Sequence, residues 1–392
     1  MALDRAQTGD TLQPLPARFR ALDGWRGILA LCVAIYHTYW LSNLNSSAFF
    51  EQGVVLIDLF FVFSGFLMWT LYGGIRTGTE AMEFFKRRFA RLYPVHLVMT
   101  LVVLAYAGVR VAAHALGFGT VEPGEVLPFQ PGASEGWGSL LSNLLLLQSL
   151  GLHEQLTYNV PSWTISTEAA AYLVFAAVCV WAPLRRNWQF WMLGAGVAGL
   201  YATLAAVRPD MNITYDLGLL RCLAGFGTGV IAARLYPLVK LGMARLAYST
   251  RTVVEVAVAL AFGLFVIYLP GKGQFLVGAF ALVFMAVFAQ DSGALSRFLS
   301  HRAFAYVARI SYSVYMVHFI IAVGFGIVAN TIFPRVLGDW NPAGWGGDLL
   351  LLPYLAVVII AADRLYRWVE APAAAWLRRT RPARLAETAT AP

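Results

Sequence analysis

The chain has 392 residues, of which 59% are hydrophobic and only 13% are charged, and its mean hydropathy is +0.64. These values exclude an ordinary soluble globular protein and indicate a polytopic membrane protein. The formal net charge of +8 requires no nucleic-acid partner, because basic loops beside anionic lipid headgroups account for it.

Apolar segments long enough to cross a bilayer recur along the whole chain, and they predict an all-α bundle of about ten transmembrane helices. The predicted spans are Trp25–Leu41, Val54–Tyr72, Pro94–Leu116, Ser162–Leu184, Trp188–Val207, Tyr215–Leu235, Val253–Leu269, Phe275–Gln290, Tyr306–Ile332 and Leu349–Tyr366. The apolar segment Trp137–Leu150 is shorter, and we expect it to form a buried or interfacial helix within a loop.

The distribution of Lys and Arg predicts that both termini are cytoplasmic. With that orientation the outer loops carry only Arg208, Lys272 and Arg335, whereas the other basic residues of the loops and termini lie inside. The first twenty residues lack the apolar region of a cleavable signal, so the first span is predicted to be an uncleaved anchor. We expect residues 1–20 to form a cytoplasmic tail, 21–375 the membrane domain and 376–392 a basic, mobile tail. The three cysteines fall within predicted spans and show no metal-binding spacing.

The first span contains Arg26 at its polar end and His37 near its middle. Eleven residues correspond to about three helical turns, so both side chains share one face, roughly 16 Å apart along the axis. Ionisable groups inside a membrane are costly, which makes both residues candidates for function. The alternative is a histidine satisfied by a neighbouring helix and an arginine that anchors the interface.

The second span carries Asp58 and, six residues later, Ser64 followed by Gly65 within an aromatic run. A Ser-Gly pair allows close approach of a helix or a ligand, and a packing notch is favoured over a catalytic serine. No nucleophile-elbow pattern surrounds Ser64.

Arg88 and Arg91 lie in the basic run directly before Pro94, the residue predicted to begin the third span. Their spacing places both guanidinium groups on one helical face, an arrangement suited to multidentate phosphate binding. A purely topological role for the basic run is an equal alternative.

The fourth span opens with Trp163 and holds Glu168 about 9 Å below its outer boundary. A buried carboxylate needs a partner, and His37 is the candidate at a similar depth. A carboxylate that orients and charges an imidazole is a known acid/base arrangement, although the sequence does not establish this contact.

The later spans add Arg221, a second membrane-embedded cation, and the pair Tyr312 and His318, of which His318 lies near mid-membrane. For Tyr312 and His318, packing and hydrogen bonding are favoured over catalysis. The segment from Trp368 to Pro372 is interpreted as a helix terminus at the interface, where Glu370 is available to pair with the basic loops.

Together these motifs resemble the acyltransferase type 3 family of bacterial integral-membrane enzymes, over about residues 20 to 375. The matching segments are Leu22-Asp23-Gly24-Trp25-Arg26-Gly27 with His37, Phe60-Phe61-Val62-Phe63-Ser64-Gly65-Phe66, Arg87-Arg88-x2-Arg91-Leu92-Tyr93-Pro94, Ser162-Trp163-x4-Glu168, Ser311-Tyr312-x2-Tyr315-x2-His318 and Val369-Glu370-x-Pro372. The resemblance implies transfer of acyl groups, usually acetyl from acetyl-CoA, to hydroxyls of surface glycans, lipid-linked sugars or some antibiotics. It also implies that Arg26 and His37 are essential and that the chain resides in the bacterial cytoplasmic (inner) membrane. In contrast to the fused family members, no extracytoplasmic hydrolase-like domain is expected here.

These inferences combine into one mechanistic hypothesis. Arg26, Arg88 and Arg91 would hold the phosphates of acetyl-CoA at the inner face. His37 would deprotonate a hydroxyl of a glycan, glycolipid or related acceptor while Glu168 stabilises the imidazolium. An acetyl-histidine intermediate remains open, and no metal is expected. The competing class is a transporter or flippase of a glycolipid or small metabolite, which buried charges favour and the lack of an inverted repeat disfavours.

Overall fold

The computed structural model describes residues 19–118, 126–337 and 345–379, and over these ranges the secondary structure is helical, with no strand. The helices are α1 (Arg20–Tyr36), α2 (Ala48–Glu51), α3 (Leu56–Tyr72), α4 (Gly78–Ala115), α5 (Trp137–Leu144), α6 (Trp163–Trp181), α7 (Asn187–Val207), α8 (Gly218–Ala244), α9 (Tyr248–Tyr268), α10 (Val277–Phe288), α11 (Ala294–Leu299), α12 (Arg302–Ile327), α13 (Phe333–Leu337), α14 (Trp345–Leu365) and α15 (Ala371–Arg379). The short 3₁₀ or π segments are η2 (Gly53–Val55), η3 (Val160–Ser162), η4 (Gly271–Leu276), η5 (Val328–Ile332) and η6 (Tyr366–Glu370).

Each of the ten predicted spans corresponds to a helix. Within the described ranges, nine helical segments are long and apolar enough to cross a membrane. The tenth predicted span corresponds to α1, which has 17 residues and is shorter than these segments. The helix α5 has eight residues, too few to cross, as expected for a helix within a loop. The protein is therefore an all-α, multi-pass membrane bundle, as predicted.

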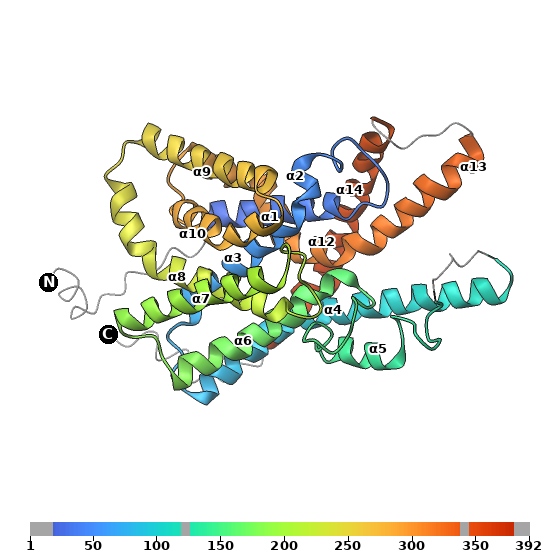
Figure 1. The fold of residues 1–392 in the computed structure, drawn as a ribbon, viewed down its shortest axis with the longest axis horizontal. Helices are drawn as coiled ribbons and strands as arrows, with labels where there is room; N and C mark the ends of the chain where they lie inside the picture. Colours follow the sequence, from blue (N-terminus) through green and yellow to red (C-terminus); the bar gives the residue numbers. More distant parts are fainter. Residues whose placement is uncertain (1–18, 119–125, 338–344, 380–392) are drawn as a thin grey trace.

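The helices form a bundle in which α1 and α3 lie centrally, while α4 and α12 project furthest to one side (Figure 1). In the apolar stretch that includes α3, 61% of the residues are buried inside the protein. In that of α7, only 17% are buried. Trp191 of α7 is 80% exposed, and such apolar side chains on the periphery face lipid in a membrane. The functional residues must therefore be sought between the central helices.

Glycines permit the closest contact in the bundle, between α3 and α8. A Cβ atom at Gly65 would overlap the backbone carbonyl of Phe226, and one at Gly229 would overlap the carbonyl of Val62. Small residues allow such backbone approach in membrane helices. The interpretation of Gly65 as a packing notch agrees with this contact.

The prediction that Pro94 begins a span is wrong, because α4 begins sixteen residues earlier. A capping box fixes its true start: the Thr77 hydroxyl accepts from the Glu80 N–H, and the Glu80 carboxylate accepts from the Thr77 N–H, both at 3.2 Å. Pro94 lies inside the helix. The basic run with Arg88 and Arg91 is consequently a rigid part of α4 and not a loop.

The prediction that His37 lies near the middle of the first helix is also wrong, because α1 runs from Arg20 to Tyr36 and His37 is its C-cap. Side chains beyond the helix end capture its carbonyl groups: the Thr38 hydroxyl and the Asn45 amide donate to the Ile35 carbonyl at 3.0 and 3.2 Å. Arg26 correspondingly lies inside the helix and not at its polar end.

Both ends of α1 are held by distant parts of the chain. The Asp291 carboxylate accepts from the backbone N–H groups of Arg20 and Ala21 at 2.9 and 2.7 Å. At the other end, the Tyr354 hydroxyl donates to the Ala34 carbonyl at 2.9 Å. The tail predicted to be mobile from residue 376 is helical as far as residue 379, where α15 ends. The rest of this tail, residues 380–392, and the predicted N-terminal tail up to residue 18 lie outside the described residues.

Candidate active site

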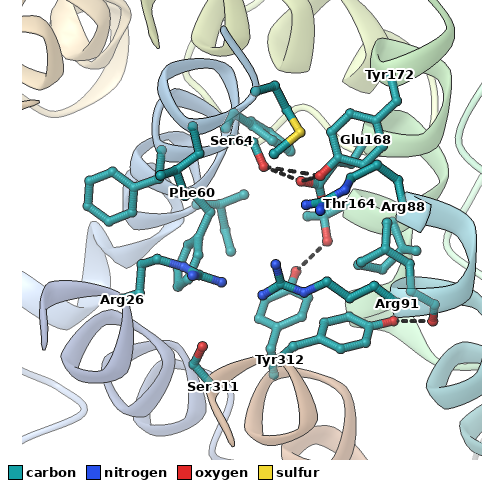
Figure 2. A pocket seen from close by; sticks show the side chains of 18 residues that line it. Arg26, Phe60, Ser64, Arg88, Arg91, Thr164, Glu168, Tyr172, Ser311 and Tyr312 are labelled. Atoms are coloured by element: carbon teal, nitrogen blue, oxygen red, sulfur yellow. Dashed lines mark hydrogen bonds between the residues drawn. The ribbon is translucent and has the colours of Figure 1, made fainter. Parts of the chain in front are cut away.

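An internal cavity lies where α1, α3, α4, α6 and α12 meet (Figure 2). Its walls are mostly apolar and aromatic, with polar and charged groups directed inward, the composition typical of a ligand pocket. The predicted site residues that line it are Arg26, Ser64, Arg88, Arg91, Glu168 and Tyr312.

Three guanidinium groups from two helices converge on this cavity. Figure 2 shows Arg26 of α1 and Arg91 of α4 pointing into it from opposite sides, with Arg88 of α4 above Arg91. Arg88 lies over the Tyr72 ring at 5.3 Å and donates to its hydroxyl at 3.3 Å, but its Nε is buried without a hydrogen-bond partner. Like charges gathered in one place and an unused donor both favour an anionic ligand.

Glu168 supplies the single carboxylate among the described lining residues. It accepts a hydrogen bond from the Ser64 hydroxyl and another from the Tyr172 hydroxyl at 2.5 Å. These contacts bring Glu168 into the arginine-lined cavity, and among the described contacts none joins it to His37. The sequence-based pairing of the two is therefore not supported, because Glu168 faces α3 whereas His37 caps the end of α1.

His37 lies instead beside His318 of α12. The Nε2 atom of His318 is 3.3 Å from Nδ1 of His37, and the two ring centres are 5.1 Å apart. His37 Nδ1 is also 2.9 Å from the Val33 carbonyl oxygen. His318 is fully buried, while His37 is half-buried. The contact agrees with the alternative interpretation, in which a neighbouring helix satisfies His37.

Asp58, Trp163 and Arg221 form a separate cluster away from the cavity. Arg221 donates to both Asp58 oxygens, from Nε at 3.1 Å and from Nη2 at 2.7 Å, and both side chains are fully buried. It also donates to the carbonyls of Ile213 and Val54 and lies over the Trp163 ring at 5.4 Å. All three guanidinium nitrogens thus donate to protein groups, which assigns this cluster to packing of α3, α6 and α8.

Tyr312 and Tyr315 connect the cavity with its surroundings. The Tyr312 hydroxyl donates to the Leu92 carbonyl of α4 at 2.5 Å. Tyr315 also lines the cavity, and its ring lies 5.8 Å from that of His318. This tyrosine therefore stands between the cavity and the histidine pair.

Sequence reasoning did not select Tyr172, Thr164 or Tyr315 as site residues, although all three line the cavity. Tyr172 follows Glu168 by four residues, which places both on one face of α6 and was the available signal. Thr164 and Tyr315 hydrogen-bond to each other at 3.1 Å, a contact between residues 151 apart that no local pattern reveals.

Fold and site together define a multi-pass membrane protein with an arginine-lined cavity inside its helix bundle. The chain belongs to the acyltransferase type 3 family: the family profile Acyl_transf_3, described as an acyltransferase domain, matches residues 19–365. It is therefore a membrane acyltransferase, which favours the enzyme over the transporter or flippase alternative.

Several curated proteins are similar to this chain. Acyltransferase MdmB of Streptomyces mycarofaciens is 28% identical over 426 residues, covering 97% of each chain. Protein 2 in picA locus of Rhizobium radiobacter is 31% identical over 177 residues, covering 42% of this chain and 84% of its own. Peptidoglycan O-acetyltransferase OatA of Listeria monocytogenes is 24% identical over 377 residues, covering 90% of this chain but 55% of OatA. No solved structure matches.

Proposed function

We propose that this enzyme transfers an acetyl group from cytoplasmic acetyl-CoA to a hydroxyl of an extracytoplasmic or lipid-linked glycan or a related acceptor, in the bacterial inner membrane. The observation that carries the proposal is the convergence of Arg26, Arg88 and Arg91 on one cavity that contains a single carboxylate, Glu168, among its described lining residues. Asp23 lies 3.8 Å from Arg26, but three arginines around one lining carboxylate still favour a polyanionic ligand.

The nucleotide end of acetyl-CoA supplies phosphates of the required charge. Planar guanidinium groups bind phosphate oxygens in a bidentate manner, and Arg88 keeps an unused Nε donor for this purpose. In the orientation predicted from the Lys and Arg distribution, the cavity arginines lie toward the cytoplasm, where acetyl-CoA is made.

The chemistry is proposed to take place at His37. The step along α1 from Arg26 to His37 is roughly 16 Å, comparable to an extended pantetheine arm, so the thioester can approach His37 while the phosphates stay at the arginines. Nε2 of His37 takes the proton of the acceptor hydroxyl, whose oxygen attacks the thioester carbonyl carbon. The carbon–sulfur bond then breaks, and the CoA thiolate receives the proton from the imidazolium. In the acetyl-histidine variant, the same Nε2 attacks the carbonyl first.

The similarity to named relatives supports a hydroxyl acceptor. OatA is named as an O-acetyltransferase of peptidoglycan, and 90% of this chain aligns with it. MdmB, which matches over nearly the full length of both chains, is named only as an acyltransferase. The acceptor is therefore proposed by class, as a hydroxyl-bearing glycan, glycolipid or related molecule.

Calorimetric titration of acetyl-CoA into the detergent-purified protein tests the donor site. Replacing Arg88 or Arg91 by Ala should weaken binding about ten- to a hundredfold, the value of one charge-assisted phosphate contact. Lys at either position should restore part of the affinity, because it keeps the charge but loses the bidentate geometry. Arg87→Ala is the matched control, since Arg87 is exposed on the same helix and does not line the cavity.

A companion assay measures acetyl transfer or acetyl-CoA hydrolysis. His37→Ala should abolish turnover while acetyl-CoA still binds and the protein still inserts into the membrane. Affinity unchanged in all arginine variants would remove Arg88 and Arg91 from the donor site. Turnover above a tenth of the wild-type value in His37→Ala would exclude His37 as base or nucleophile.

A further inference from the structure

We infer that His318 is a positioning residue for His37: its unprotonated Nε2 accepts the Nδ1–H of His37, which leaves Nε2 of His37 as the reactive atom. The inference rests on the proposed role of His37 and adds to it the atom that reacts and the group that supports it.

Backbone carbonyls determine where the protons of the pair lie. A carbonyl oxygen can only accept, so the nitrogen that approaches it must carry hydrogen. Nδ1 of His37 is 2.9 Å from the Val33 carbonyl oxygen, and Nδ1 of His318 is 3.3 Å from that of Val314. Both histidines are therefore assigned a proton on Nδ1.

This assignment makes the contact between the rings complementary. A neutral His318 with hydrogen on Nδ1 has a lone pair on Nε2, and this atom lies 3.3 Å from Nδ1 of His37. The single hydrogen on His37 Nδ1 is then shared between His318 and the Val33 carbonyl. The opposite tautomer of His318 would place two N–H groups against each other, which is unfavourable in a buried site.

The consequence for catalysis is that Nδ1 of His37 is engaged, whereas Nε2 has no hydrogen-bond partner among the described residues. Neutral His37 carries its lone pair on Nε2, whether it acts as base or as nucleophile. When Nε2 takes a proton, the Nδ1–H keeps both acceptors, so His318 stabilises the imidazolium without a carboxylate. This arrangement replaces the orienting role that the sequence analysis gave to Glu168.

The surroundings of the pair leave His318 little other function. It is fully buried and does not line the arginine cavity. The titratable side chains that face the pair are Tyr36, whose ring centre lies 4.8 Å from His37, Tyr315, and Tyr354, whose hydroxyl donates to the His318 carbonyl at 3.4 Å. Tyrosines are neutral near pH 7, so no opposing charge from these groups replaces the imidazole acceptor.

Nitrogen-15 spectra of histidine-labelled protein test the assignment independently of activity. The chain has six histidines, and His37→Gln and His318→Gln identify the two signals. Near neutral pH we expect both residues to be protonated on Nδ1 and unprotonated on Nε2. A proton on Nε2 of His318 would overturn the inference, whether or not the preparation transfers acyl groups. A lack of acyl transfer with the expected protonation would contradict only the proposed function.

Kinetics with acetyl-CoA test the positioning role. His318→Phe keeps a ring but removes the acceptor, and it should lower kcat at least tenfold with KM for acetyl-CoA unchanged. The acidic limb of the kcat–pH profile should move to lower pH, because the imidazolium loses an acceptor. In His318→Gln the amide oxygen can replace Nε2 as the acceptor. This variant should therefore keep most of the wild-type kcat and the wild-type position of the acidic limb.

Tyr354→Phe is the control, because it removes hydrogen bonds to the Ala34 and His318 carbonyls but leaves both imidazoles in place. It should leave the kcat–pH profile unmoved. If His318→Phe also left the profile and kcat unmoved, or if Gln and Phe behaved alike, His318 would be a packing residue and the inference would be wrong.

Discussion

Two buried arginine environments show how surroundings decide the role of one residue type. Each guanidinium nitrogen of the fully buried Arg221 donates to Asp58 or to a backbone carbonyl, so the protein itself holds this group. Arg88 lines the internal cavity, and among the described residues its buried Nε has no hydrogen-bond partner. An arginine whose nitrogens all donate to the protein stabilises the fold as long as its acidic partner is present. An arginine with an unengaged nitrogen can bind a ligand.

The Asp58–Arg221 pair should therefore behave as a structural unit. Asp58→Ala or Arg221→Ala leaves an unpaired charge in the bundle and should destabilise the protein by about 3–5 kcal/mol. The double variant Asp58→Leu with Arg221→Met should lose much less than the sum of the single changes. Thermal unfolding in detergent, followed by fluorescence-detected gel filtration, measures these differences.

The ion pair between Arg208 and Asp216 provides the comparison, since both its side chains are partly exposed. Arg208→Gln should change stability by less than about 1 kcal/mol. Additive losses at Asp58 and Arg221 would show that the two residues do not depend on each other.

At this scale the sequence identified the charged residues but not their partners. Arg26 and Glu168 were selected as ionisable groups inside the membrane, and Arg88 and Arg91 for their spacing on one helical face; all four line the cavity. The pairing of these groups depends on how the helices pack. His37 and His318, for example, are in contact although they lie 281 positions apart in the sequence. No local spacing contains that information.

Among the elements, α1 is the one whose position matters most, because it carries both Arg26 and His37. Asp291 caps its first N–H groups from a loop that follows α10. Asp291 itself has a positive φ of 49°, a conformation that Asp and Asn adopt more readily than most residues. Burial raises the pKa of Asp291, and the hydrogen bonds from Ala21 and Arg20 oppose that rise.

Because the folded-state pKa is raised, the stabilising contribution of the neutral form is complete below the ordinary pKa and is lost as pH rises through the raised value. Asp291→Asn keeps the backbone preference and one of the two acceptor oxygens without the charge, so it should be less destabilised at pH 7 than Asp291→Ala. Asp291→Ala loses the cap and should cost about 0.5–2 kcal/mol.

Unfolding temperatures of the two variants across pH 4–8 check this expectation. Ser292→Ala is the adjacent control, because the buried Ser292 hydroxyl has no hydrogen-bond partner. An Asn variant as unstable as the Ala variant would show that the charge, and not the acceptor, holds α1.

Helix existence was predictable from apolar length, but helix boundaries depended on capping groups. The ten apolar segments all contain helices, yet α4 begins at a Thr77–Glu80 capping box that lies within a polar stretch. The end of α1 depends on Asn45, a side chain ten residues beyond the carbonyl that it binds. Apolar periodicity reports burial and is insensitive to such hydrogen bonds.

For the molecule as a whole, the orientation in the membrane decides which side supplies the acyl donor. The Lys and Arg asymmetry predicts that both termini are cytoplasmic. Single cysteines at Arg186 or Arg245 should then resist membrane-impermeant thiol reagents in intact cells, whereas one at Gly132 should react. All three positions are exposed, so access to the protein surface does not limit labelling.

A background in which Cys32, Cys179 and Cys222 are replaced removes unwanted labelling, and permeabilised cells provide the control in which all three sites react. Labelling in the reverse pattern would place the arginine-lined cavity toward the outside and contradict the cytoplasmic donor.

The long-range contacts of α1 also bear on how the protein is made. Synthesis begins with α1, but the residues that hold its two ends lie 270 and 320 positions later, and His318 lies 281 positions after His37. At 5–20 residues per second, about 15 to 60 s pass between synthesis of the two histidines. During that interval Arg26 and His37 are in the nascent chain without their final neighbours. A chain terminated before α12 would therefore contain His37, the proposed reactive residue, but not His318, so the proposed site is complete only when synthesis is almost finished.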